Sequence, residues 1–173
     1  GLKVEVELLT RSKDDATLRD LPATPVPRLI PDDQVHIEAV NDNDFPIDIN
    51  VLYVGADYSI SHMFKGRVLP GDRLKKGLLR VTDGNFGRDR LVVVMTPAKP
   101  QTEVEDLGFL EQDAVEMTRA AGVQPTRTGF DAALFEAGFG TTTRGATALV
   151  DEAEDTGSGP MMLQFDLDTV PAN

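Results

Sequence analysis

The chain has 173 residues, of which 40% are hydrophobic and 27% are charged, a composition that indicates one soluble globular domain and excludes a disordered chain. The net charge of −12 excludes general binding to a nucleic-acid backbone, and the absence of cysteine excludes disulfides, thiolate nucleophiles and cysteine-based zinc sites. No apolar run approaches the roughly 18 residues that a membrane-spanning helix requires, so we expect neither nucleic acid nor membrane as a partner.

Seven strands are predicted along the chain, mostly from apolar residues that alternate with polar ones. They cover about residues 2–8, 35–39, 47–53, 58–64, 78–82, 91–95 and 163–167. Four prolines between residues 10 and 33 exclude regular structure from most of that segment. The run Leu91–Met95 is apolar throughout, which is typical of a central strand buried on both faces.

Two helices are predicted before the last of these strands. Thr102 and Glu105 match a capping box, and apolar residues follow them at helical spacing. A second, shorter helix is predicted over residues 129–137, so the insertion covers about residues 102–138. The predicted fold is therefore mainly β: an antiparallel β-sandwich of about seven strands with a two-helix insertion before the last strand.

The hairpin over residues 57–62 holds the residue types of nucleophilic hydrolysis, namely Asp57, Ser59, Ser61 and His62. A catalytic triad normally draws its members from distant segments and needs an oxyanion hole, and no G-x-S-x-G motif occurs in the chain. Because Ser59 and Ser61 alternate with Ile60, we interpret these hydroxyls as the polar face of a strand. We therefore expect no catalytic residue in the hairpin.

Two further polar patterns invite a metal-site interpretation. His36 and Glu38 share the polar face of a strand, but a zinc site would need both histidines of the chain together with carboxylates. The run Asn41–Asp44 begins like a calcium loop, yet Pro46 and Leu52 occupy positions where an EF-hand needs Gly and Glu. A turn whose side chains bond to their own backbone explains this run better, and no metal is expected.

The run over residues 138–143 is similar to a phosphate-binding loop in its glycine and threonine content. It lacks the G-x-x-x-x-G-K-[ST] pattern and no predicted strand precedes it. We interpret it as the start of a flexible segment over about residues 139–160, which is rich in Gly, Thr and acidic residues. No cofactor is expected.

Five basic residues gather between positions 65 and 76 of this acidic chain. The simplest interpretation is a solvated face, although the group also suits an acidic partner surface. Apolar residues of the predicted insertion that are left off the sheet would offer a second contact. The candidate interaction surface consists of Arg73, Lys75, Lys76, Phe109 and Phe135.

The run DINVLYVGADYSISHMFKGRVLPGDRLKKGLLRVTDGNFGRDRLVVVMTP lies within about residues 34–100. Its order of a Leu-Tyr-Val strand, a small turn, a strand with Met-Phe, a Pro-Gly turn and an apolar strand closing on Thr-Pro resembles a non-catalytic β-domain of unknown function. That domain lies C-terminal to caspase-like (metacaspase or orthocaspase) peptidase domains in bacteria. The runs EDLGFLEQDA and LQFDLDTVP are similar to parts of the same C-terminal regions. Caspase-like catalysis uses a His and a Cys, so this cysteine-free chain takes no catalytic residue from the resemblance.

The resemblance implies a structural or regulatory accessory domain whose partner is an upstream caspase-like peptidase domain or another protein. Gly1 stands where an initiator Met is usual, and we expect residues 1–173 to be a single domain cut from a longer protein. We expect this fragment not to be an enzyme, and a cytoplasmic location is favoured. The alternative is a free-standing binding protein or a weak hydrolase that uses the polar groups of residues 57–62.

Overall fold

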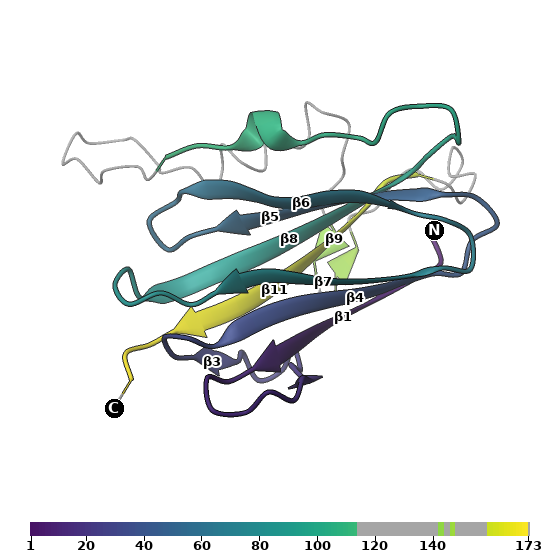
Figure 1. The fold of residues 1–173 in the computed structure, drawn as a ribbon. Helices are drawn as coiled ribbons and strands as arrows, with labels where there is room; N and C mark the ends of the chain where they lie inside the picture. Colours follow the sequence, from purple (N-terminus) through teal and green to yellow (C-terminus); the bar gives the residue numbers. More distant parts are fainter. Residues whose placement is uncertain (114–141, 144–145, 148–158, 173) are drawn as a thin grey trace.

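The described part of the chain comprises residues 1–113, 142–143, 146–147 and 159–172 of a computed structural model, and two β-sheets build most of it. One sheet has the strand order β2-β1-β4-β7, and the other has the order β3-β11-β8-β5-β6 (Figure 1). The strands are β1 (Val4–Arg11), β2 (Arg19–Asp20), β3 (Arg28–Leu29), β4 (Gln34–Asn41), β5 (Ile47–Val54), β6 (Ile60–Val68), β7 (Arg73–Arg80), β8 (Gly87–Pro97) and β11 (Met161–Thr169). A separate two-stranded sheet pairs β9 (Thr142–Thr143) with β10 (Ala146–Thr147).

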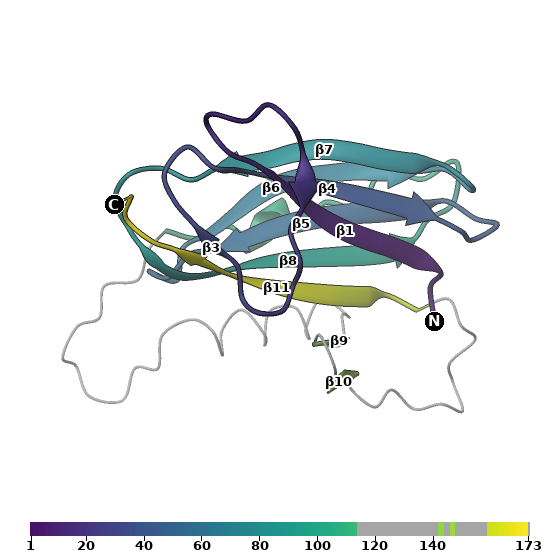
Figure 2. The same cartoon turned by 90° about the horizontal axis from the view of Figure 1, so that it is seen from below.

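The main core lies between the two sheets. Strands β1, β4, β5, β8 and β11 run antiparallel to their long neighbours, so successive side chains alternate between the two faces of each sheet. The residues that alternation directs inward are fully buried and form one apolar cluster, which includes Val35, Ile37, Ile47, Ile49, Val51, Leu91, Val93 and Met95. The result is a sandwich-like arrangement in which the first and last residues of the described chain lie at opposite ends (Figure 2).

The seven strands that are at least eight residues long correspond to the seven that the sequence predicts. The prediction of a buried central strand at residues 91–95 is confirmed, because β8 lies between β11 and β5 and its residues from Asp89 to Met95 are buried. The largest difference in bounds concerns β7, which begins at Arg73 and not at residue 78. Its first half is Arg-Leu-Lys-Lys-Gly, and charged residues of this kind are common on the edge strands of sheets.

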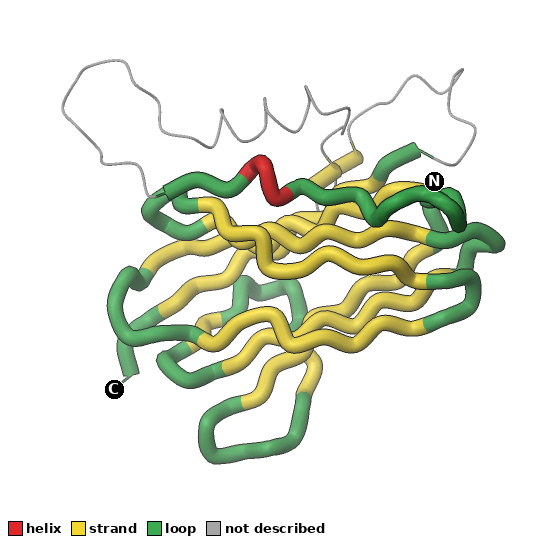
Figure 3. The backbone as a smooth tube through the Cα atoms, turned by 45° about the horizontal axis from the view of Figure 1, so that its top comes forward, coloured by secondary structure: helices red, strands yellow, loops and turns green. Residues whose placement is uncertain are grey.

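A strap formed by residues 99–113 crosses the outer face of the five-stranded sheet. It contains one short 3-10 helix, Gly108–Leu110, which Figure 3 shows above the strands. Leu107 and Leu110 of the strap pack with outward-facing residues of β5, β6, β8 and β11 in a second buried cluster, completed by Leu52, Val54, Ile60, Val92, Val94 and Met162. The strap therefore covers part of the outer face of the five-stranded sheet, whereas Arg88 of β8 remains exposed on that face.

The prediction of a helix that begins at Thr102 is wrong for the residues described, since residues 102–113 contain no α-helix. The capping box does not form: the Thr102 hydroxyl donates to the carbonyl of Lys99 at 2.8 Å. The backbone N–H of Glu105 donates to Asp48 of β5 at 3.0 Å and not to Thr102. The second predicted helix at residues 129–137, with Phe135, lies outside the described residues, as does most of the segment 139–160.

Candidate functional site

The β5–β6 hairpin ends in a tight turn at one end of the sandwich. The N–H of Gly55 donates to the carbonyl of Ser59, and the N–H of Tyr58 donates to the carbonyl of Gly55, both at 2.9 Å. Asp57 Oδ1 accepts the hydroxyl of Ser59 at 2.6 Å and its N–H at 3.1 Å, which lowers the pKa of Asp57. A Cβ on Gly55 would lie 2.6 Å from that same oxygen, so a larger residue would displace the Asp57 side chain.

A buried carboxylate, Asp89 at the start of β8, lies behind this turn. It accepts the hydroxyl of Tyr53, and its Oδ1 accepts the N–H of Ala56 at 2.8 Å. Thr169 Oγ1 at the end of β11 lies 3.5 Å from the other oxygen. Burial raises the pKa of Asp89 in spite of these donors, and burial together with the neighbouring carboxylate also raises the pKa of the Tyr53 hydroxyl. Asp89 thus ties the hairpin to β8 and β11.

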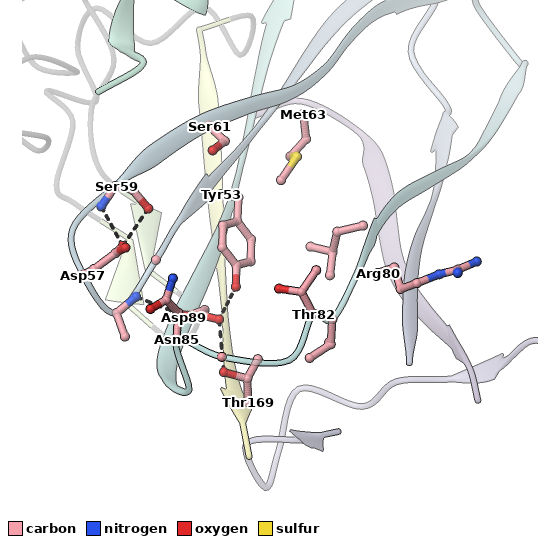
Figure 4. A pocket seen from close by; sticks show the side chains of 15 residues that line it. Tyr53, Asp57, Ser59, Ser61, Met63, Arg80, Thr82, Asn85, Asp89 and Thr169 are labelled. Atoms are coloured by element: carbon pink, nitrogen blue, oxygen red, sulfur yellow. Dashed lines mark hydrogen bonds between the residues drawn. The ribbon is translucent and has the colours of Figure 1, made fainter. Parts of the chain in front are cut away.

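These groups line a polar pocket of about 250 Å³ between the two sheets. Ser59 and Asp57 form one wall and Asp89 the floor, with Asn85 next to Asp89, while Thr82 lies on the far side (Figure 4). Its lining also includes Tyr53, Ser61, Met63 and Thr169. Such a site offers carboxylate and hydroxyl oxygens to a small polar molecule, and two of its hydroxyls, those of Ser59 and Tyr53, are bonded to its carboxylates.

His62 does not line the pocket, because it faces the other side of β6. Its Nε2 lies 2.7 Å from Asn50 Oδ1, and its Nδ1 lies 3.8 Å from Asp106 Oδ1 in the strap. Ser61, the preceding residue, lines the pocket on the inner side, as expected for successive residues of a strand. The structure therefore places Ser61 and His62 on opposite faces of β6, with the His62 ring bonded to Asn50 of β5.

The strap is fixed by polar side chains that point outward from β5 and β6. Arg67 forms a two-point ion pair with Asp48, with 2.7 Å from Nε to Oδ1, and donates to the carbonyls of Lys99 and Thr102 at 3.0 and 2.9 Å. Asn50, only 1% exposed, accepts the N–H of Leu107 at 3.1 Å. Backbone groups that a helix would satisfy internally are thus satisfied by the sheet, and the strap becomes a fixed surface.

The residues considered as metal ligands are engaged elsewhere. His36 Nε2 lies 3.0 Å from Gln34 Oε1, and Glu38 forms an ion pair with Arg73 at 2.8 Å. Within the described ranges, no three His, Asp or Glu residues are placed to hold a metal ion. Asn41 Oδ1 accepts the N–H of Asn43 at 2.9 Å, which confirms the interpretation of residues 41–44 as a turn bonded to its own side chains.

The candidate interaction residues lie in two separate places. Arg73, Lys75 and Lys76 are exposed on β7, an edge strand of the four-stranded sheet, where Glu38 contacts Arg73 and, at 4.0 Å, Lys75. Phe109 lies on the strap over the other sheet and is 67% exposed. They do not form one continuous surface. Sequence reasoning singled out Asp57, Ser59 and Ser61 of the polar pocket. It missed Asp89 and Thr169, which are 80 residues apart and meet only through strand pairing.

Comparison with known proteins places no family name on this fold. No family model matches the chain, and no curated protein matches it. Among the described residues, no helix has the length and apolar character needed to cross a membrane.

Proposed function

We propose that this chain is a non-catalytic interaction domain that docks onto a caspase-like cysteine peptidase domain within a longer protein, through the strap. The observation that carries the proposal is the exposure of Phe109. Its neighbours Leu107 and Leu110 are buried in the sheet, so the aromatic ring is held outward by two apolar anchors. An aromatic side chain on a fixed support loses little entropy when it enters a partner's pocket.

The surroundings of Phe109 define the surface that would receive it. The strap carries five acidic residues, and Lys65 neutralises only one of them, Asp106, at 3.0 Å. The others, Glu103, Glu105, Glu111 and Asp113, are all exposed. An apolar pocket with a basic rim on the peptidase domain would complement this arrangement, because opposite charges at the rim steer the two surfaces together.

The test compares one variant with a matched control. The peptidase domain encoded in the same reading frame is purified separately and titrated with residues 1–173 by calorimetry. We expect Phe109→Asp to weaken association at least about tenfold, because a charge in an apolar pocket has no partner there. Leu69→Asp changes another exposed apolar residue (53% exposed, in the β6–β7 turn) and should leave the affinity unchanged.

Three outcomes would refute the proposal. The first is a reading frame that lacks a caspase-like peptidase domain, the second is the absence of association between the two domains, and the third is equal weakening of association by the two variants. A change in the stability or rate of the parent peptidase on deletion of residues 1–173 would support it, provided that Phe109→Asp reproduces the change.

A further inference from the structure

Three polar side chains lie side by side at one end of the outer face of the four-stranded sheet. Arg11 of β1 is paired with Gln34 of β4, and Gln34 is paired with Arg80 of β7. Paired residues on neighbouring strands point to the same face of a sheet. Val35, the residue after Gln34, is fully buried in the core, so Gln34 and its two paired arginines point away from the core. Figure 4 shows the Arg80 guanidinium directed away from Tyr53 and the polar pocket.

The spacing lets both guanidinium groups reach one small group. Neighbouring strands lie about 4.8 Å apart, so the Cα atoms of Arg11 and Arg80 are separated by roughly 10 Å. An arginine side chain extends far enough to cover half of that distance from either strand. Gln34 lies between them, with its Oε1 3.0 Å from His36 Nε2.

Neither arginine has an acidic partner among the described residues. Arg67, Arg73 and Arg88 each form an ion pair with a carboxylate, but no carboxylate oxygen of the described chain lies within 4.0 Å of Arg11 or Arg80. The Nε–H of Arg11 is moreover buried and makes no hydrogen bond. Because that atom is closed to solvent, an acceptor from outside would reach the Arg11 side chain, which is only partly buried, through its terminal Nη–H groups.

A hollow of about 670 Å³ lies directly beside these side chains. Its lining carries three cations and two carboxylates, and one carboxylate, Asp32, lies 3.8 Å from the Lys13 ammonium. The lining residues that offer polar groups are Arg11, Ser12, Lys13, Asp32, Gln34 and Arg80, together with Asp14. The excess of one positive charge is small, which favours a singly charged anion over a phosphate dianion that Asp14 and Asp32 would repel.

We propose that Arg11, Gln34 and Arg80 form a binding site for a carboxylate group. The guanidinium fork presents two parallel N–H donors that match the two carboxylate oxygens. The carboxylate belongs either to an acidic side chain of a peptide or to a free small acid, and both present the same chemistry. The site lies on the opposite sheet from Phe109, so it goes beyond the proposed docking function. The two proposals are therefore tested independently of each other.

The experiment records two-dimensional ¹H–¹⁵N spectra of residues 1–173 at low salt, because screening weakens exposed ion pairs. One arm adds an N-acetylated, C-amidated peptide of alternating Glu and Ser, and the other adds succinate. We expect the side-chain Nε–H signal of Arg11 and the side-chain amide of Gln34 to shift with saturation in at least one arm. The arm with the lower Kd identifies the source. No saturable shift in either arm would overturn the proposal.

Two variants and a control separate a built site from general charge attraction. Arg80→Gln should raise Kd at least about tenfold, since it removes one of the two forks. Arg11→Lys keeps the charge but lacks the pair of parallel N–H donors of the guanidinium, and should raise Kd several-fold. Arg73→Gln removes an arginine of the same strand that is already paired with Glu38, and should leave Kd unchanged. Equal weakening by Arg73→Gln, or unchanged binding in both Arg80→Gln and Arg11→Lys, contradicts the site.

Discussion

Leu107→Ala is expected to destabilise the protein strongly even though it lies in a segment without regular structure for most of its length. Leu107 is fully buried between the strap and the five-stranded sheet. The substitution removes three side-chain carbons, about 2.4 kcal/mol of transfer free energy at roughly 0.8 kcal/mol per carbon. The cavity that remains adds up to about 1 kcal/mol, because the strap can move partly into it. The total is about 3 kcal/mol, or roughly 6–12 °C in Tm for a chain of this size.

Urea unfolding followed by circular dichroism measures this loss. Phe109→Ala is the control two residues away, and because its side chain is 67% exposed it should change the free energy of unfolding by less than about 0.5 kcal/mol. The slope m should stay the same in both variants, which shows that the same surface is exposed on unfolding. If Leu107→Ala proves as stable as Phe109→Ala, the strap does not pack on the sheet and the argument for a fixed Phe109 fails with it.

Two other predictions concern buried charge. Arg67→Gln leaves the Asp48 carboxylate buried without its ion-pair partner, so the strap should open more often. A Glu-specific protease should therefore cut after Glu103 faster in this variant than in the wild type or in the control Arg73→Gln. Equal cleavage rates would show that Arg67 does not hold the strap. Burial raises the pKa of Asp89, so the stability that it contributes falls as pH rises from about 3.8 through the raised pKa. The free energy of unfolding of Asp89→Asn, measured by urea titration, should therefore increase relative to that of the wild type as pH rises from about 4 to 7. If the difference between the two free energies does not change with pH, the pKa of Asp89 is not raised.

The strands were predictable from the sequence because burial on one face imposes a period of two. In β5 the inward residues Ile47, Ile49 and Val51 recur at that period, and the unbroken apolar run of β8 follows from burial on both faces. The start of β7 escaped the prediction for the opposite reason. As an edge strand it buries little, so Arg73 to Gly77 carry no periodic signal.

The hairpin residues of the polar pocket could be singled out from the sequence, but the other members of the polar sites could not, because pairing between distant strands brings them together. Arg11, Gln34 and Arg80 become neighbours only through the registers of two strand pairs, and neither register is written in the local pattern. Likewise, the capping-box pattern at Thr102 and Glu105 is a local signal that competes with distant partners. Asp48 binds the N–H of Glu105 across 57 positions, and this contact decides the conformation.

The outer face of β5 nevertheless held a signal that the sheet is covered. Its outward residues are Asp48, Asn50, Leu52 and Val54, in that order, and a strand with one face in water would not place two large apolar residues there. The apolar half therefore requires a cover. Once buried, a covering segment without regular structure must bond its backbone N–H and C=O groups to side chains. The polar half of the outer face of β5, Asp48 and Asn50, therefore marks where the backbone of the strap is bound. A central strand whose outward face changes from polar to apolar thus indicates a bound strap, and Asn50, which binds both the N–H of Leu107 and the carbonyl of Glu105, is the residue at which the two halves meet.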